Sequence, residues 1–136
     1  MAIGMSGKNY LLDTNILIGL FANESSIVEK IIRYNPTGIF IPSIALGELF
    51  YGAEQSTKKE ENRKKIDALA LSSSIVECDV DTARLYGKIK SLLRSKGSPI
   101  PENDIWIAAL AQQHKLILVT RDNHFNNIEA LLVENW

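Results

Sequence analysis

The chain has 136 residues, of which 46% are hydrophobic, and its 15 lysines and arginines nearly balance its 16 aspartates and glutamates. This length is typical of one domain. One cysteine and two histidines exclude a disulfide framework, a zinc site with four Cys/His ligands and an HExxH protease site. The formal net charge of −1 argues against a polycationic nucleic-acid binder. The single cysteine fits a reducing compartment, so we expect a cytoplasmic protein.

The first residues are small and polar, without the basic and apolar regions of a signal peptide. We expect residues 1–8 to be flexible and residues 9–136 to form one domain. The longest apolar runs are Ile105–Ala111 and Leu116–Val119. Because both are far shorter than the roughly 20 residues that span a membrane, we predict no membrane association.

Short apolar runs, which are typical of buried strands, alternate with segments of helical periodicity. In chain order we predict a strand at Tyr10–Leu12, helices at Ile16–Phe21 and Ser26–Tyr34, a strand at Gly38–Ile41, helices at Ser43–Gln55 and Lys58–Leu71, a strand at Ser74–Glu77, a long helix between Asp79 and Gly97, a helix at Asp104–Gln113, and strands at Leu116–Val119 and Leu131–Val133.

Several helix ends have sequence signals of their own. Ser26 and Glu29 have the spacing of a capping box, and Asp79 and Asn103 are suitable N-caps. Gly97 is a typical helix stop.

The alternation of predicted strands and helices favours an α/β domain with a mostly parallel sheet and helices on both faces. Ligands of such sheets bind beyond the carboxyl ends of the strands.

Two predicted strands are followed by an aspartate, Asp13 after the first and Asp122 after the fourth. An aspartate in this position is most often a turn or cap residue. If both strands belong to one parallel sheet, however, the two carboxylates project at the same edge. The pair is therefore a candidate site.

Two further acids lie on predicted helices. Asp104 is within about 60° of the apolar stripe of its helix, although it could simply complement the helix dipole. Glu48 lies almost opposite the core stripe of its helix, which equally fits a solvated face. Because Ile44 and Tyr51 share that back face, the helix is apolar nearly all round and a covered Glu48 is the alternative.

Four clustered carboxylates need a cation, because two unit charges about 4 Å apart repel by about 4 kcal/mol at an effective dielectric near 20. Mg²⁺ or Mn²⁺ prefers such oxygen ligands and could activate a water for phosphodiester hydrolysis. Asn15, Ser43 and Thr120 could orient ligands or waters, or could be ordinary turn and cap residues. His114 and His124 lack partners at ligand spacing. For His124, which is near Asp122, a role at the site is the less favoured alternative.

The order and spacing of four segments resemble the PIN-domain family and, within it, the VapC-type toxins of toxin–antitoxin pairs. These segments are Leu12–Asn15, Ser43–Ala53, Asn103–Ala109, and Leu118–Asp122 followed by Phe125. The resemblance implies a five-stranded sheet of order 3-2-1-4-5 and an Mg²⁺- or Mn²⁺-dependent endoribonuclease. It also implies a homodimer and a cognate antitoxin whose C-terminal segment reaches the acidic site.

Carried over by motif, Asp13, Glu48, Asp104 and Asp122 match the catalytic, metal-binding acids of the family. Asn123 stands beside Asp122, so the motif leaves open which of the two faces the metal. A PIN-like nuclease acting on DNA or in RNA processing is an alternative, as is a non-catalytic metal-binding interaction module. A phosphoacceptor domain would need a lysine after the last strand, and an aspartyl phosphatase would need an aspartate in place of Asn15.

Overall fold

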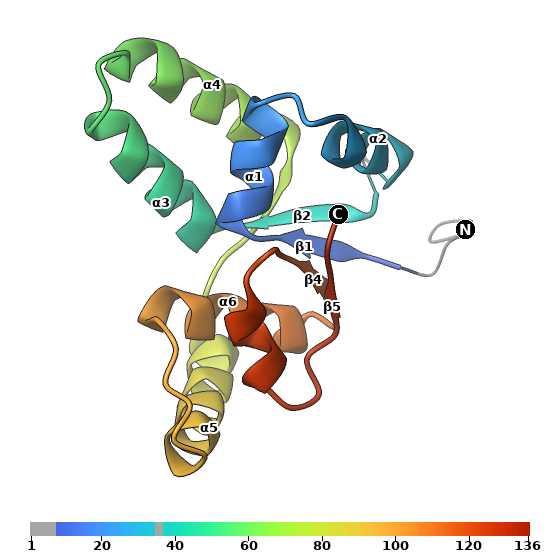
Figure 1. Cartoon of the computed structure of the whole chain (residues 1–136), viewed down its shortest axis with the longest axis vertical. Helices are drawn as coiled ribbons and strands as arrows, with labels where there is room; N and C mark the ends of the chain where they lie inside the picture. Colours follow the sequence, from blue (N-terminus) through green and yellow to red (C-terminus); the bar gives the residue numbers. More distant parts are fainter. Residues whose placement is uncertain (1–7, 35–36) are drawn as a thin grey trace.

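The computed structural model describes residues 8–34 and 37–136. Its sheet has five strands in the order β3-β2-β1-β4-β5, and each neighbouring pair is parallel (Figure 1). The predicted α/β class and strand order are confirmed. Residues 1–7 of the segment expected to be flexible lie outside the described residues. The strands are β1 (Tyr10–Leu12), β2 (Ile39–Pro42), β3 (Ser74–Val76), β4 (Ile117–Val119) and β5 (Val133–Glu134).

Helices cover both faces of the sheet, as expected. Figure 1 shows α1 to α4 on one side of the strands and α5 and α6 on the other. Among the described residues, no helix is both long and apolar enough to cross a membrane. The helices are α1 (Thr14–Phe21), α2 (Ser25–Tyr34), α3 (Ser43–Glu54), α4 (Lys59–Ser72), α5 (Val80–Ser95) and α6 (Glu102–Gln113), with a short 3₁₀ helix, η1, at Asn123–Asn127.

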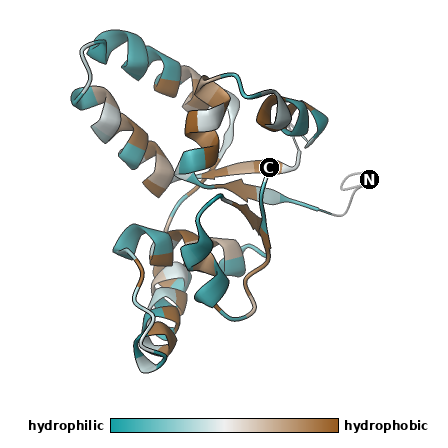
Figure 2. Ribbon diagram, in the orientation of Figure 1, coloured by the Kyte–Doolittle hydropathy of each residue, from teal (hydrophilic) through white to brown (hydrophobic). Residues whose placement is uncertain are grey.

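The central strands contribute to two separate hydrophobic cores because successive side chains of a strand point to opposite faces. In β1, Leu11 packs with the α5 and α6 side, whereas Tyr10 and Leu12 pack with α1 to α4. In β4, Leu118 and Val119 divide in the same way. Figure 2 shows the hydrophobic colouring on these strands and hydrophilic colouring over much of α4. Packing on both faces therefore fixes β1 and β4 against each other.

The register of the sheet sets the positions that follow β1 and β4. Leu12 pairs with Val119, and the N–H of Asp13 donates to the carbonyl of Val119 over 3.0 Å. The chain therefore leaves both strands at the same level, with Asp13 beside Thr120. Parallel pairing brings together two segments that are more than a hundred residues apart in sequence.

Four helix starts differ from the prediction by one or two residues. Helix α1 begins at Thr14 and not Ile16, and α4 begins at Lys59 and not Lys58. Helix α6 begins at Glu102, with Pro101 and not Asn103 as its N-cap, because the carbonyl of Pro101 accepts the N–H groups of Asp104 and Ile105. Asp104 is thus the third residue of the helix. Helix α2 begins at Ser25, so the predicted cap Ser26 lies inside its first turn.

The other two predicted helix-end signals are confirmed. Asp79 caps α5 in a capping box with Thr82, and Gly97, with φ of +68°, follows the end of the helix.

The C-terminal strand was predicted slightly too early. It is Val133–Glu134 and not Leu131–Val133, because Leu118 N–H donates to the carbonyl of Leu132 and Thr120 N–H to that of Glu134. The 3₁₀ helix η1 was not predicted. It is held down by Phe125, which is completely buried in the core on the α5 and α6 side.

Replacement of Phe125 by alanine tests this anchor. We expect Phe125→Ala to lower the free energy of unfolding by about 3–5 kcal/mol, because a fully buried ring is removed and a cavity remains. Ile32→Ala is the control, since Ile32 is 72% exposed and its loss should change stability by less than about 0.5 kcal/mol. Urea unfolding measures both. Equal stability of the two variants would contradict the assignment.

Candidate metal centre

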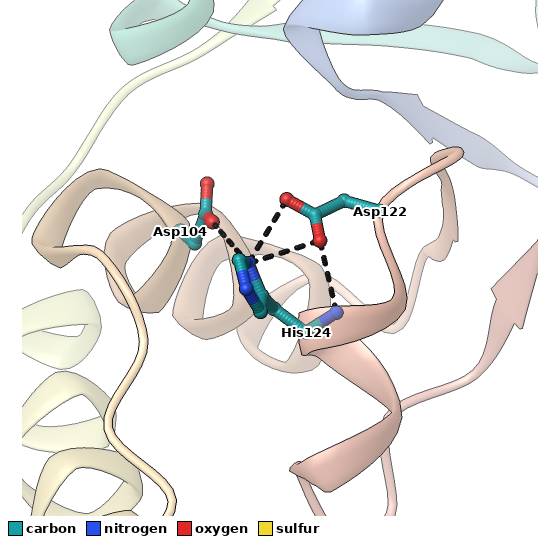
Figure 3. A group of neighbouring side chains, drawn as sticks. All are labelled: Asp104, Asp122 and His124. Carbon is teal, nitrogen blue, oxygen red and sulfur yellow. Dashed lines mark hydrogen bonds and ion pairs between the residues drawn. The ribbon is translucent and has the colours of Figure 1, made fainter.

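Three side chains, one from α6, one from η1 and one from the residue before η1, come close enough to share one ion. One carboxylate oxygen of Asp104, one of Asp122 and one ring nitrogen of His124 lie within 4.8 Å of one another (Figure 3). His124 Nδ1 is 3.0 Å from Asp122 Oδ1 and 4.0 Å from Asp104 Oδ2. Asp122 is also the N-cap of η1, accepting the N–H of His124 over 2.9 Å.

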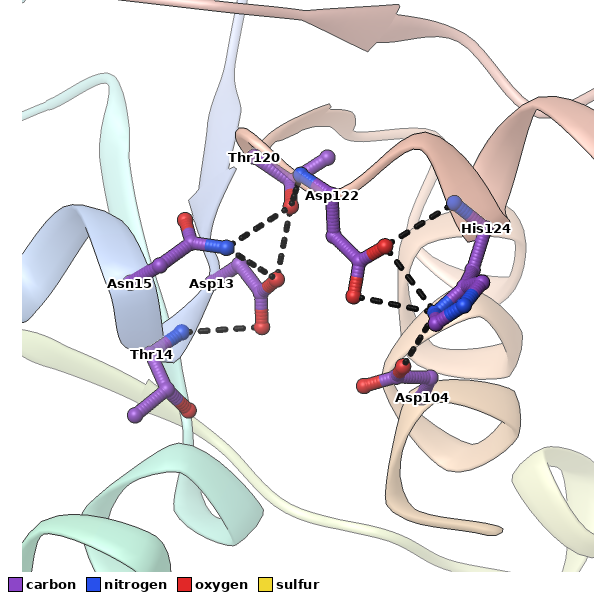
Figure 4. A network of polar contacts seen from close by, with 7 residues as sticks. All are labelled: Asp13, Thr14, Asn15, Asp104, Thr120, Asp122 and His124. Atoms are coloured by element: carbon purple, nitrogen blue, oxygen red, sulfur yellow. Dashed lines mark hydrogen bonds and ion pairs between the residues drawn. The ribbon is translucent and has the colours of Figure 1, made fainter. Parts of the chain in front are cut away.

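Asp13 is the most buried of the four predicted acids, with only 4% of its surface exposed. The hydroxyl of Thr120 donates to its Oδ2 over 2.7 Å, and the N–H of Thr14 donates to its Oδ1 over 2.8 Å. Asp13 is therefore also the N-cap of α1. Figure 4 shows its carboxylate facing the same space as those of Asp104 and Asp122.

Glu48 comes from α3, which follows β2 directly. Its side chain is partly buried, and its Oε1 accepts the hydroxyl of Thr14 over 3.0 Å. This bond turns Glu48 toward the residues after β1 and away from solvent. Of the two readings that the sequence leaves open, the structure therefore supports the covered one.

The negative charges of the other three predicted acids act on Asp104. The pKa of Asp104 is raised to about 6, first by burial and then by the negative charges of Asp13, Asp122 and Glu48, with His124 opposing the shift. Burial also raises the pKa of Asp13, against the hydrogen bonds from Thr120 and Thr14.

Such a set of oxygen ligands with uncompensated negative charge fits a hard divalent cation such as Mg²⁺ or Mn²⁺. Asp13, Glu48, Asp104 and Asp122 are the residues that would hold it.

Two of the three predicted supporting residues are in contact with the acids. Thr120 donates to the carboxylate of Asp13, and its hydroxyl oxygen accepts the backbone N–H of Asp122 over 3.0 Å, so one side chain links Asp13 to the backbone of Asp122. Asn15 donates to Thr120 over 3.3 Å and to Asp13 over 3.4 Å. Within residues 8–34 and 37–136, Ser43 makes no hydrogen bond to the acids, and it serves as the first residue of α3.

Of the neighbouring residues Asp122 and Asn123, the structure favours Asp122 as the one that faces the site. Its side chain is partly buried and faces the site, whereas Asn123 is exposed. His124, for which a site role was the less favoured alternative, lies with Asp104 and Asp122. The available signal was the local spacing, because an aspartate that caps a 3₁₀ turn accepts the N–H two residues later and so brings that side chain alongside.

Arg121 ties this loop to the rest of the molecule. Its guanidinium donates to both carboxylate oxygens of Glu24, over 3.0 and 2.9 Å, and to the carbonyl of Trp136 over 3.3 Å. Its N–H donates to Asn15 Oδ1 over 3.2 Å. Gly19 leaves room for this contact, since an added Cβ would lie 2.6 Å from Glu24 Oε2. We call the Glu24–Arg121 pair the clamp, and the sequence alone did not reveal it.

Comparison with known proteins identifies related sequences over nearly the whole chain. The PIN domain family model matches residues 10–131. Ribonuclease VapC2 of Haemophilus influenzae is 36% identical over 128 residues, covering 93% of this chain and 97% of the relative. The tRNA(fMet)-specific endonuclease VapC of Shigella flexneri is 32% identical, with the same coverage of both chains.

Solved structures share the same architecture. VapBC2 from Rickettsia felis, bound to a DNA fragment from its promoter, contains a chain with a TM-score of 0.86 and 33% identity, covering 93% of this chain and 98% of that one. DNA-bound VapBC from Salmonella typhimurium gives a TM-score of 0.88 and 30% identity, covering 95% of this chain and 98% of that one.

Replacement of Asp104 by asparagine tests whether its negative charge is unfavourable in the folded protein. An acid whose pKa rises from 3.8 to about 6 on folding destabilises the folded state at higher pH, because the unfolded chain ionises more readily. Asp104→Asn should therefore raise the free energy of unfolding in EDTA at pH 8 by about 1–3 kcal/mol. The gain should shrink toward pH 4, where the wild-type carboxyl is protonated when folded.

Urea unfolding in EDTA at both pH values measures this difference. Added Mn²⁺ should stabilise the wild type more than Asp104→Asn, since only the wild type keeps all four carboxylates. A variant that is no more stable than the wild type at pH 8 would refute the crowding of charge at this site.

Proposed function

Because this chain belongs to the PIN domain family and is related over 93% of its residues to VapC ribonucleases, we propose that it is a metal-dependent endoribonuclease, the toxin of a type II toxin–antitoxin pair. Its catalytic and metal-binding residues in this proposal are Asp13, Glu48, Asp104 and Asp122. The observation that supports it is geometric, because ligand atoms of Asp104, Asp122 and His124 lie within 4.8 Å of one another. Burial and then the negative charges of Asp13, Asp122 and Glu48 raise the pKa of Asp104, which agrees with this arrangement.

Mg²⁺ or Mn²⁺ is the proposed cofactor. When bound, such an ion supplies a Lewis acid that activates water and stabilises negative charge on a phosphodiester. The donor set supports this choice, because the four carboxylates are hard ligands and the nearby His124 adds a single nitrogen. RNA phosphate carries negative charge, so without the cation the acids would repel the substrate.

The chain's own residues hold the reacting groups in place. Thr120 fixes Asp13 and Asp122 relative to each other through its hydroxyl. Thr14 does the same for Asp13 and Glu48, through its N–H and its hydroxyl respectively. Because Asp13 and Glu48 are held by hydrogen bonds before substrate arrives, little reorganisation of these two acids is needed during the reaction.

The partners follow from the same relationship. We propose that a cognate antitoxin binds this chain, since related chains occur in VapBC toxin–antitoxin complexes. We also propose RNA as substrate, a homodimer as the working state and the cytoplasm as the location, where a ribonuclease toxin meets its RNA. Size-exclusion chromatography with light scattering tests the dimer.

Cleavage of a defined panel of RNAs tests the activity. We expect cuts in Mg²⁺ or Mn²⁺ and none in EDTA. Asp13→Asn should reduce the rate by at least about a hundredfold, because a group that orients the reacting centre is lost. Asp67→Asn, which changes an exposed acid of α4, is the matched control and should cleave at the wild-type rate. Cleavage that persists in EDTA, or in the Asp13 variant, would rule out the mechanism.

Growth of a bacterial host tests the toxin assignment. Induced expression of the wild type should arrest growth, and Asp13→Asn should relieve the arrest at an equal protein level. Immunoblotting checks that level, and circular dichroism of the purified variant checks its fold. Arrest by both proteins would show that toxicity does not come from the acidic site.

A further inference from the structure

An open hollow of about 620 Å³ lies beside the acidic site. It shares Thr14 and Glu48 with that site, and its remaining walls come from the neighbouring turns of α1 and α3 and from the start of α6. Its side chains beyond the acids include Ile18, Tyr51 and Asn103. The hollow is therefore a direct extension of the site and not a separate pocket.

The spacing along the two helices explains how the hollow arises. Thr14 and Ile18 are four residues apart on α1, and Gly47 and Tyr51 are four residues apart on α3, so each pair shares a helix face. A Cβ added to Gly47 would meet no atom within 4 Å. The space beside Gly47, which lines the hollow, is therefore open.

Several apolar side chains are exposed together in the walls of the hollow. Tyr51 is 69% exposed and Ile18 is 56% exposed, and Ile44 adds a partly buried aliphatic surface on the same side. Asn103 contributes an amide that can donate and accept hydrogen bonds. An exposed aromatic ring, aliphatic walls and one amide are the groups that bind an unpaired nucleobase.

We propose that this hollow binds the nucleoside adjacent to the scissile phosphate of a single-stranded RNA, with its base stacked on Tyr51 and its edge bonded to Asn103. The inference rests on the proposed ribonuclease function. Continuity with the acids favours RNA over a protein segment, because Glu48 belongs both to the proposed metal site and to the lining of the hollow that contains Tyr51. A phosphate bound by a cation at these acids would therefore lie next to the hollow.

Kinetics on a short single-stranded RNA test the proposal. Base stacking on an aromatic side chain is strong enough that Tyr51→Ala should raise KM by about 5- to 100-fold with a smaller change in kcat. Tyr51→Phe, which keeps the ring, should recover most of the affinity. Asn103→Ala should raise KM unequally for different bases at the cleavage position. Leu71→Ala, at a residue of α4 that is 90% exposed, is the control.

Two further measurements separate the hollow from the acidic site. Calorimetric titration with Mn²⁺ should give the same affinity for Tyr51→Ala as for the wild type. Fluorescence anisotropy with the uncleaved RNA should show weaker binding when Tyr51→Ala is added to Asp13→Asn. The anisotropy experiment needs no cleavage, so it tests the subsite even if the ribonuclease proposal fails.

The opposite results would overturn the inference. RNA affinity and KM that are unchanged in Tyr51→Ala would show that the base does not stack there. If the same variant lost affinity for an antitoxin protein while keeping its affinity for RNA, the hollow would be a protein-binding surface instead.

Discussion

Repulsion between the carboxylates at the sheet edge would drive them into water if the backbone that carries them were loose. Asp13 and Asp104 stay in place although burial and neighbouring charge raise the pKa of both. The sheet makes this arrangement stable, because β1 and β4 are packed on both faces. The energy that holds the acids together thus comes from apolar burial some distance away, and a bound cation would relieve the remaining repulsion.

Hydroxyl and amide groups orient the carboxylates on this rigid backbone. Thr120 and Thr14 each contact two acids or their backbone. Asn15 joins the first turn of α1 to the loop after β4 through Thr120 and Arg121. The clamp between Glu24 and Arg121 holds the same loop from outside. Its partners are half exposed, so its direct contribution to stability is small. Its importance is geometric, because it joins the start of α2 to the loop that carries Asp122.

Much of this could be predicted from the sequence because strand ends and helix faces are local patterns. The apolar runs located β1 and β4, and parallel pairing then placed Asp13 and Asp122 together. Glu48 was undecided because its partner, Thr14, is remote in sequence. The early start of α6 and the late start of β5 depend on individual backbone hydrogen bonds that no periodicity encodes. A site role for His124 remained the less favoured alternative because the 3₁₀ turn that brings it to Asp122 has no apolar pattern.

The strand order has a consequence for synthesis on the ribosome. β1 pairs with β2 on one side and with β4 on the other, and more than fifty residues separate Glu48 from Asp104. A nascent chain that has emerged only through α4 therefore carries Asp13 and Glu48 without the two acids that complete the set. The edge of β1 that pairs with β4 in the complete sheet is still unpaired at this stage. Vectorial translation thus keeps the acidic site unassembled until the second half of the domain has left the exit tunnel.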